Sequence, residues 1–129
     1  MSIGGTPTSL CIKNTVGRFE VVYSNVMEVC QGGPEIGSLS INGEEIVGRR
    51  FGGPFIARND VILIPEFKRK FVKSGFVLCV IDLTSGSSTE KSKLLPLIYL
   101  DRVEGNKVYF FEDVDRVKES YVEVETFGH

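Results

Sequence analysis

The clearest structural signal in the chain is the stretch GSLSINGEEIV, residues 37–47. Apolar and polar residues alternate in it as far as Ile41, which is the pattern of a half-buried strand. Asn42-Gly43 follows, and both residues tolerate the positive φ of a type I′ turn. Asn-Gly between two strand-like segments is a strong hairpin signal, so we predict a β-hairpin over residues 37–47.

Segments on both sides of this hairpin share its β character. They are short, rich in branched aliphatic and aromatic residues, and separated by turn residues such as Gly105-Asn106. The predicted strands are residues 19–23, 26–30, 61–64, 76–83, 94–100, 107–111 and 121–125. Residues 76–83 are apolar on both faces apart from Asp82, which predicts a strand covered on both sides. Polar residues 84–91 predict a hairpin loop, and Pro96 indicates an edge, a bulge or a strand start.

Two short segments carry helical signals. Pro65 suits the first position of a helix over residues 65–71 and would end the strand before it. Asp113 is a candidate N-cap for a helix over residues 113–119. We therefore predict an all-β fold, a mainly antiparallel sandwich or barrel, with about eight to ten short strands and one or two short helical turns.

Length and composition predict one domain. The chain has 129 residues, of which 42% are hydrophobic and 25% are charged, the ordinary proportions of a protein with a single core. We therefore assign residues 1–129 to one β-rich domain. Residues 1–7 have no basic start and no apolar stretch, and no apolar run approaches the ~20 residues that cross a bilayer. We accordingly expect a cytoplasmic protein.

Residues that usually carry catalysis are scarce. The one histidine, His129, is the last residue, which argues against histidine-based triads and histidine metal sites. The three cysteines, Cys11, Cys30 and Cys79, have apolar neighbours and no C-x-x-C spacing, so we interpret them as buried packing residues. The glycine-rich turns match no phosphate-binding loop. We therefore predict a protein that is not an enzyme and binds no cofactor and no metal.

The distribution of charge along the chain points to a protein partner. From Asp101 onward, eight acidic residues outnumber four basic ones, and two tyrosines lie among them. Acidic charge attracts a basic partner, and tyrosine is favoured in binding surfaces, unless the acidic and basic segments neutralise each other in the fold. We predict a binding protein that engages a protein partner. Its role is analogous, in size and character only, to that of bacterial immunity proteins, which neutralise a toxin or an enzyme. The predicted contact residues are Tyr109, Glu112, Asp113, Asp115, Glu119, Tyr121, Glu123 and Glu125.

Two other functions remain open at this point. The surplus of phenylalanine and branched aliphatic residues would also suit a small-molecule-binding barrel or sandwich. Basic residues near phenylalanines would suit binding of single-stranded nucleic acid through segment 68–73. The basic residues are Arg49, Arg50, Lys68, Arg69, Lys70 and Lys73, and the rings are Phe51, Phe55, Phe67, Phe71 and Phe76.

The net charge restricts these alternatives. At −2 it makes nucleic acid and membranes unfavourable as main partners, so we expect no membrane partner. It does not exclude a local basic patch. Pairing of an edge strand with a second copy, and hence a homo-oligomer, also stays open.

Overall fold

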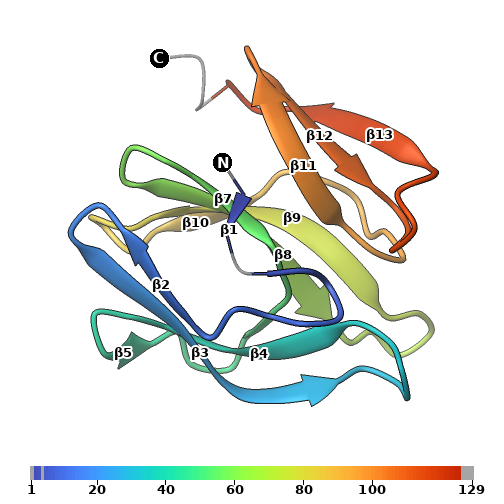
Figure 1. The fold of residues 1–129 in the computed structure, drawn as a ribbon, viewed down its shortest axis with the longest axis horizontal. Helices are drawn as coiled ribbons and strands as arrows, with labels where there is room; N and C mark the ends of the chain where they lie inside the picture. Colours follow the sequence, from blue (N-terminus) through green and yellow to red (C-terminus); the bar gives the residue numbers. More distant parts are fainter. Residues whose placement is uncertain (1, 4, 126–129) are drawn as a thin grey trace.

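The computed structural model describes residues 2–3 and 5–125, and these form two antiparallel β-sheets (Figure 1). The large sheet comprises β1 (Ser2–Ile3), β2 (Lys13–Val16), β3 (Phe19–Glu28), β4 (Glu35–Ile41), β5 (Glu44–Glu45), β6 (Arg50–Phe51), β7 (Phe55–Arg58), β8 (Val61–Lys68), β9 (Gly75–Asp82) and β10 (Ser88–Glu90). The small sheet comprises β11 (Tyr99–Glu104), β12 (Lys107–Phe111) and β13 (Glu119–Glu123). The predicted all-β, mainly antiparallel fold is confirmed. The strands outnumber the prediction because β1, β5 and β6 span only two residues each.

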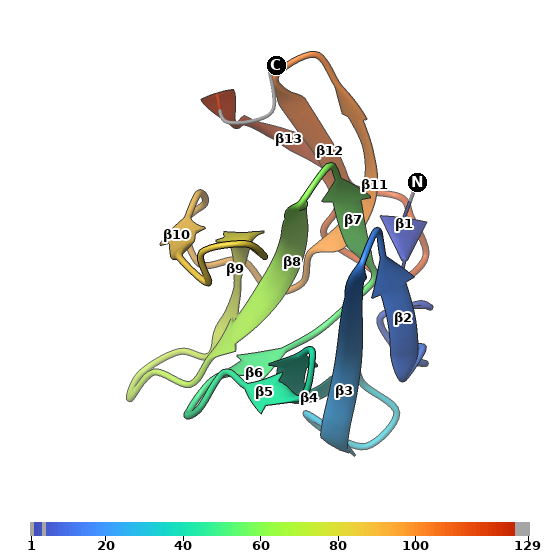
Figure 2. The ribbon, with the colours of Figure 1, turned by 90° about the vertical axis from the view of Figure 1, so that its left-hand side faces the viewer.

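Strands β8 and β9 form the middle layer of the molecule (Figures 1 and 2). They pair along their full length, and their side chains are buried on both faces. One face, which includes Ile62 and Ile81, packs against β2, β3 and β4. The other face, which includes Leu63 and Leu78, packs against the small sheet. The architecture is a sandwich, and the predicted burial of residues 76–83 on both sides is confirmed.

The two predicted tight turns are also present. Strands β4 and β5 pair at Ile41 and Glu44, and the two residues between them have φ values of 51° and 85°. These positive values are those that Asn42 and Gly43 were expected to adopt in a type I′ turn. Gly105, with φ of 62°, lies in the corresponding turn between β11 and β12.

Pro65 neither ends a strand nor begins a helix, contrary to the sequence prediction. Strand β8 continues through it to Lys68, and residues 65–71 contain no helix. The carbonyl oxygen of Pro65 accepts a hydrogen bond from Gly52 N at 2.8 Å. The nitrogen and oxygen of one strand residue point to the same side, so the nitrogen of Pro65 faces the junction of β6 and β7. The pairing with β9 therefore loses no hydrogen bond, which is why proline is tolerated here.

The predicted helix over residues 113–119 is a loop of turns. Asp113 does act as a cap, because its carboxylate accepts hydrogen bonds from the backbone nitrogens of Val117 and Lys118 at 2.8 and 3.0 Å. Arg116, however, has φ of 61°, which is incompatible with an α-helix. The loop leads directly from β12 into β13.

Three predicted strands have different bounds. Residues 26–28 belong to β3, which continues past an irregularity between Ser24 and Met27 where Asn25 has φ of 51°. Strand β11 begins at Tyr99, after Pro96, and the residues before it contribute only a single bridge to the large sheet. The last strand is residues 119–123 rather than 121–125.

Candidate functional site

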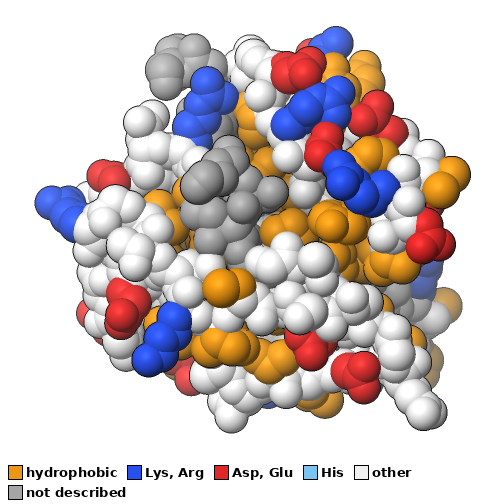
Figure 3. All heavy atoms as spheres, in the orientation of Figure 1, with side chains coloured by type: hydrophobic (Ala, Val, Ile, Leu, Met, Phe, Trp, Pro, Cys, Tyr) orange, Lys and Arg blue, Asp and Glu red, His pale blue; other side chains and the backbone are white. Residues whose placement is uncertain are grey.

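The small sheet has one buried face and one open face. Leu100, Val108 and Phe110 point into the core, where each is at most 1% exposed. The cross-strand register places the alternate side chains together on the other side, which we call the outer face. Figure 3 shows charged and apolar side chains interspersed over this part of the molecule. The outer face comprises Tyr99, Arg102, Glu104, Lys107, Tyr109, Phe111, Glu119, Tyr121 and Glu123.

Cations lie over aromatic rings along the outer face. The guanidinium of Arg102 is 4.1 Å from the ring centroid of Tyr109, and the ammonium of Lys107 is 4.9 Å from that of Tyr121. The two tyrosine rings are neighbours, with centroids 5.7 Å apart. These contacts restrict the motion of the tyrosine rings in the free protein. Binding of a partner to the rings therefore costs less side-chain conformational entropy.

Part of the acidic surplus is neutralised within the small sheet itself. Arg102 contacts the carboxylates of Asp101, Glu104 and Glu119 at 2.6, 2.7 and 3.1 Å. The hydrogen bond to Glu104 is the main reason why the pKa of Arg102 is raised. Within the described residues, the carboxylates from Asp101 onward form ion pairs only with basic residues of the same segment. Glu123 has no ion-pair partner in this part of the chain.

The structure brings together four of the eight predicted contact residues. Tyr109, Glu119, Tyr121 and Glu123 share the outer face. The other four lie outside it, three in the loop between β12 and β13 and one just after β13. They are Glu112, Asp113, Asp115 and Glu125.

Two of these carboxylates have a structural task in the loop. Glu112 accepts a hydrogen bond from the hydroxyl of Ser120, which is the main reason why its pKa is lowered, and it lies 3.3 Å from Lys118. Asp113 accepts the backbone bonds described above, and the one from Val117 contributes most to lowering its pKa. Both side chains therefore stabilise the loop in the free protein.

Strand β13 is the open edge of the small sheet, since among the described residues it pairs only with β12. The ladder is hydrogen-bonded from Glu112 N to Lys118 O at 2.9 Å and from Val124 N to Asn106 O at 2.7 Å. Bonded and non-bonded pairs alternate in an antiparallel ladder, so every second residue of β13 directs its backbone polar groups away from β12. The outward N–H and C=O groups belong to Glu119, Tyr121 and Glu123.

Sequence reasoning missed the cations and two of the rings on this side of the sheet. Arg116, in the loop before β13, lies 5.1 Å from the ring of Phe111 and 5.7 Å from that of Tyr99. The alternation of Lys107, Tyr109 and Phe111 in β12 was a signal that could have grouped part of this set. The long-range contact of Arg116 had no such signal.

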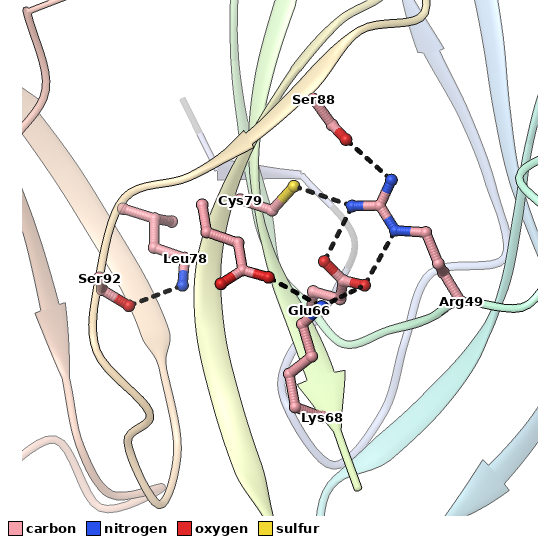
Figure 4. A network of polar contacts seen from close by, with 8 residues as sticks. Arg49, Glu66, Lys68, Leu78, Cys79, Ser88 and Ser92 are labelled. Atoms are coloured by element: carbon pink, nitrogen blue, oxygen red, sulfur yellow. Dashed lines mark hydrogen bonds and ion pairs between the residues drawn. The ribbon is translucent and has the colours of Figure 1, made fainter. Parts of the chain in front are cut away.

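A second cluster surrounds Glu66, near the end of β8 (Figure 4). Its side chain is 2% exposed, and Arg49 donates to its two oxygens at 2.8 and 2.9 Å. Lys68 lies 3.5 Å from Glu66 and 2.8 Å from Glu90. Burial alone would raise the pKa of Glu66, but Arg49, with help from Lys68, holds it below its ordinary value.

The predicted basic patch is divided between a hollow and a loop. Arg49, Arg50, Lys68 and Arg69 line a hollow of about 470 Å³. Lys70 and Lys73 lie in the exposed loop that joins β8 to β9. Of the five phenylalanines expected near the patch, only Phe71 is exposed. The other four are buried in the cores, which leaves them unable to stack on bases, although Phe67 also contributes to the wall of the hollow: Phe51, Phe55, Phe67 and Phe76.

The cysteines fall into two groups. Cys79 is buried, as predicted, whereas Cys11 and Cys30 are exposed, contrary to the sequence interpretation. The exposed pair lies in the connections before β2 and after β3, where apolar sequence neighbours do not cover them. Burial raises the pKa of the Cys79 thiol, and Arg49 offsets this only in part.

We expect two thiols of the folded chain to react quickly with a water-soluble disulfide reagent, and the third to react only on unfolding. The fast pair is Cys11 and Cys30, because the reagent reaches them without opening the core. Absorbance of the released thiolate, followed before and after addition of denaturant, measures both phases. Three thiols that react at one rate in the folded chain would contradict the burial of Cys79.

No metal-ligand cluster in the described residues and no similar known protein points to a function. Among residues 2–3 and 5–125, no three His, Cys, Asp or Glu side chains are grouped so that they could hold a metal ion, and His129 lies outside these residues. The same residues include no helix of the length and apolar character that a membrane crossing requires.

Comparison of the chain with protein-family models, curated proteins and solved structures finds no match.

Proposed function

We propose that this chain is a non-enzymatic binding protein that takes an extended, basic segment of a partner protein as an added strand on β13. The observation that carries the proposal is the composition of this edge. Glu119, Tyr121 and Glu123 have outward backbone groups, and their side chains lie together on the outer face. An added strand gains main-chain hydrogen bonds whatever its sequence, while its alternate side chains decide which sequences fit.

The side chains of the edge favour a basic segment. A lysine or arginine opposite a glutamate contributes about 0.2–1 kcal/mol in an antiparallel pair. Glu119 already shares Arg102, whereas Glu123 has no ion-pair partner among the described residues, so Glu123 offers the stronger attraction. Tyr121, which is 53% exposed, supplies apolar contact area between the two charges.

A second copy of this chain is a poorer occupant of the edge. If two β13 strands paired about Tyr121, Glu119 of each copy would lie opposite Glu123 of the other. Like charges directly opposite each other destabilise an antiparallel pair. The same side chains therefore discourage self-pairing of the edge and leave it open to a cationic strand.

An immunity- or inhibitor-type role in the cytoplasm suits such a site. The chain would act by covering a basic segment of a toxin or an enzyme, which requires binding and no chemistry. The acidic edge supports this role, because complementary charge speeds encounter with a cationic partner and selects it against others.

A set of short fluorescent peptides tests the proposal. Threonine would alternate with lysine in one peptide, with glutamate in the second and with serine in the third, and fluorescence anisotropy would measure binding at low and high salt. We expect the lysine peptide to bind, to lose affinity as salt rises, and to exceed the other two. Equal affinities for all three, or no binding of the lysine peptide at millimolar concentration, would contradict the proposal.

A pair of charge reversals locates the binding. Glu123→Lys is expected to weaken binding of the lysine peptide about tenfold, because an attraction becomes a repulsion. Glu45→Lys makes the same change of charge on the exposed strand β5 and should leave binding unchanged. Equal losses in the two variants would assign the binding to overall charge rather than to β13.

A further inference from the structure

The loop that joins β8 to β9 carries two apolar side chains with almost no contacts. It spans residues 69–74, between the paired ends of the two strands. Phe71 is 105% exposed and Val72 is 92% exposed. Figure 2 shows this loop projecting from the body of the molecule. Two adjacent large apolar side chains held in water at a projecting tip indicate a partner that buries them.

The connection between β5 and β6 adds to the same surface. Val47, in that connection, is 82% exposed. Gly48, the next residue, lines the hollow together with Arg69 of the β8–β9 loop, so the two connections are neighbours. Met27, also on the wall of the hollow, is 50% exposed. Eight large apolar side chains are exposed in the described part of the chain, and four of them lie at this end of the molecule: Met27, Val47, Phe71 and Val72.

Uncompensated positive charge surrounds these apolar residues. The two cations closest to the core, Arg49 and Lys68, are paired with Glu66 and Glu90. Four others have no carboxylate partner in the described part of the chain. They are Arg50, Arg69, Lys70 and Lys73.

The hollow between the two connections suits a phosphate. Arg50 uses one N–H on the hydroxyl of Ser38, at 2.7 Å, which fixes the guanidinium at the rim. Arg69 lies over the ring of Phe67, 5.8 Å from its centroid. A guanidinium matches two phosphate oxygens at once, and a volume of about 470 Å³ accommodates a small charged group.

We propose that this end of the molecule docks on membranes that contain anionic phospholipids. Phe71 and Val72 enter the bilayer interface, Lys70 and Lys73 contact its negative surface, and the hollow between Arg50 and Arg69 takes a headgroup phosphate. The expectation of no membrane partner rested on the net charge of −2, which averages this basic end with an acidic one. Strand β13 lies at the opposite end (Figure 2), so this proposal does not depend on the proposed function.

A bilayer fits these observations better than a nucleic acid or a folded protein. Bases would stack on Phe71, but the neighbouring Val72 and Val47 are aliphatic and offer no stacking surface. A folded protein would need a pocket matched to the projecting tip. A bilayer interface accepts projecting apolar side chains without such a match and attracts the lysines beside them.

A tryptophan reporter tests the proposal, because the chain contains none. Phe71→Trp would be mixed with vesicles of phosphatidylcholine alone or of phosphatidylcholine with phosphatidylserine. We expect a blue shift of the emission and sedimentation of the protein only with phosphatidylserine, both reduced by salt. Val117→Trp, at an 80% exposed position in the loop before β13, is the matched reporter and should show no shift. No sedimentation of the unaltered chain, or equal sedimentation with both vesicles, would overturn the proposal.

Surface variants assign the binding to the loop. Phe71→Ser with Val72→Ser should lower vesicle partitioning tenfold or more, because this variant loses the burial of two apolar side chains. Lys70→Glu with Lys73→Glu should abolish partitioning, because repulsion from the anionic surface replaces attraction. Val117→Ser and Lys13→Glu are the controls, and melting curves would show that all variants stay folded. Unchanged partitioning of either loop variant would overturn the proposal. Binding of an oligo-dT strand without a blue shift, in place of vesicle binding, would overturn it in favour of a nucleic acid.

Discussion

Replacing Arg49 with alanine is expected to lower the free energy of unfolding by about 3 kcal/mol. The guanidinium donates to both oxygens of Glu66, a carboxylate that is 2% exposed. It also reaches Ser88 at 2.8 Å and Cys79 at 3.3 Å, and so links the connection between β5 and β6 to β8, β9 and β10 (Figure 4). Without Arg49, the buried carboxylate of Glu66 would keep only one ion-pair partner, Lys68, at 3.5 Å. Urea denaturation measures the loss.

Two further variants separate the ion pair from general effects of substitution. Arg49→Met with Glu66→Leu removes both charges and is expected to recover most of the loss, because well-packed apolar residues replace a buried ion pair at little cost. Lys13→Ala, on the exposed side of β2, should leave stability unchanged. An Arg49→Ala chain as stable as the original, or a double variant less stable than the single one, would contradict the role of this pair.

Acid should reduce the difference between the original chain and Arg49→Ala. The pKa of Glu66 is lowered in the folded chain, so its contribution to stability is present at neutral pH and is lost as the pH falls through that pKa. In Arg49→Ala, burial would dominate and raise the pKa of Glu66, so protonation would relieve the variant. The difference in unfolding free energy should therefore shrink between neutral pH and about pH 4. A difference that stays constant would contradict a charged Glu66 compensated by Arg49.

Tyr121→Pro is expected to weaken binding of the lysine peptide about a hundredfold, with little effect on folding. The N–H of Tyr121 points away from β12, so proline removes an outward donor and leaves the ladder of the small sheet intact. The proline ring also blocks close approach of an added strand. Fluorescence anisotropy measures the affinity, and a melting curve measures the stability.

Tyr121→Ala is the matched control, since it removes the same ring and keeps the N–H. We expect it to lose about tenfold in affinity, which is the part due to the ring. Val122→Pro removes an inward N–H instead and should destabilise the small sheet. Equal affinities of the alanine and proline variants at residue 121 would mean that the outward amide of β13 is not used.

The β character of the fold could be predicted because its signals are local. Asn42-Gly43 sets a turn through two φ values, and residues 76–83 are apolar at nearly every position. Pro65 could not be placed correctly from sequence. Whether a proline breaks a strand depends on which neighbour its nitrogen faces, and that neighbour, Gly52, is brought there by the fold. The loop after Asp113 was misjudged because a carboxylate cap serves a turn as well as a helix.

The candidate site was predicted in part for the same reason. Alternation along a strand places Tyr121 and Glu123 on one face, and β12 adds Tyr109 by pairing. The position of β13 at a free edge was not predicted. A strand lies at an edge when no strand pairs with its second side, and this depends on the arrangement of the whole sheet. Pairing of Arg49, in the connection before β6, with Glu66 of β8 joins residues 17 apart in the chain and has no local signal.

Amide hydrogen exchange in the complex with the lysine peptide tests strand addition at β13 most directly, because it reports on each backbone N–H of the edge. In the free chain, the outward amides of Glu119, Tyr121 and Glu123 are expected to exchange fast, while Ser120 and Val122 are protected by β12. On saturation with the peptide, the three outward amides should become slow, and the exposed strand β10 should not change. Three outward amides that still exchange fast in the saturated complex would contradict the account.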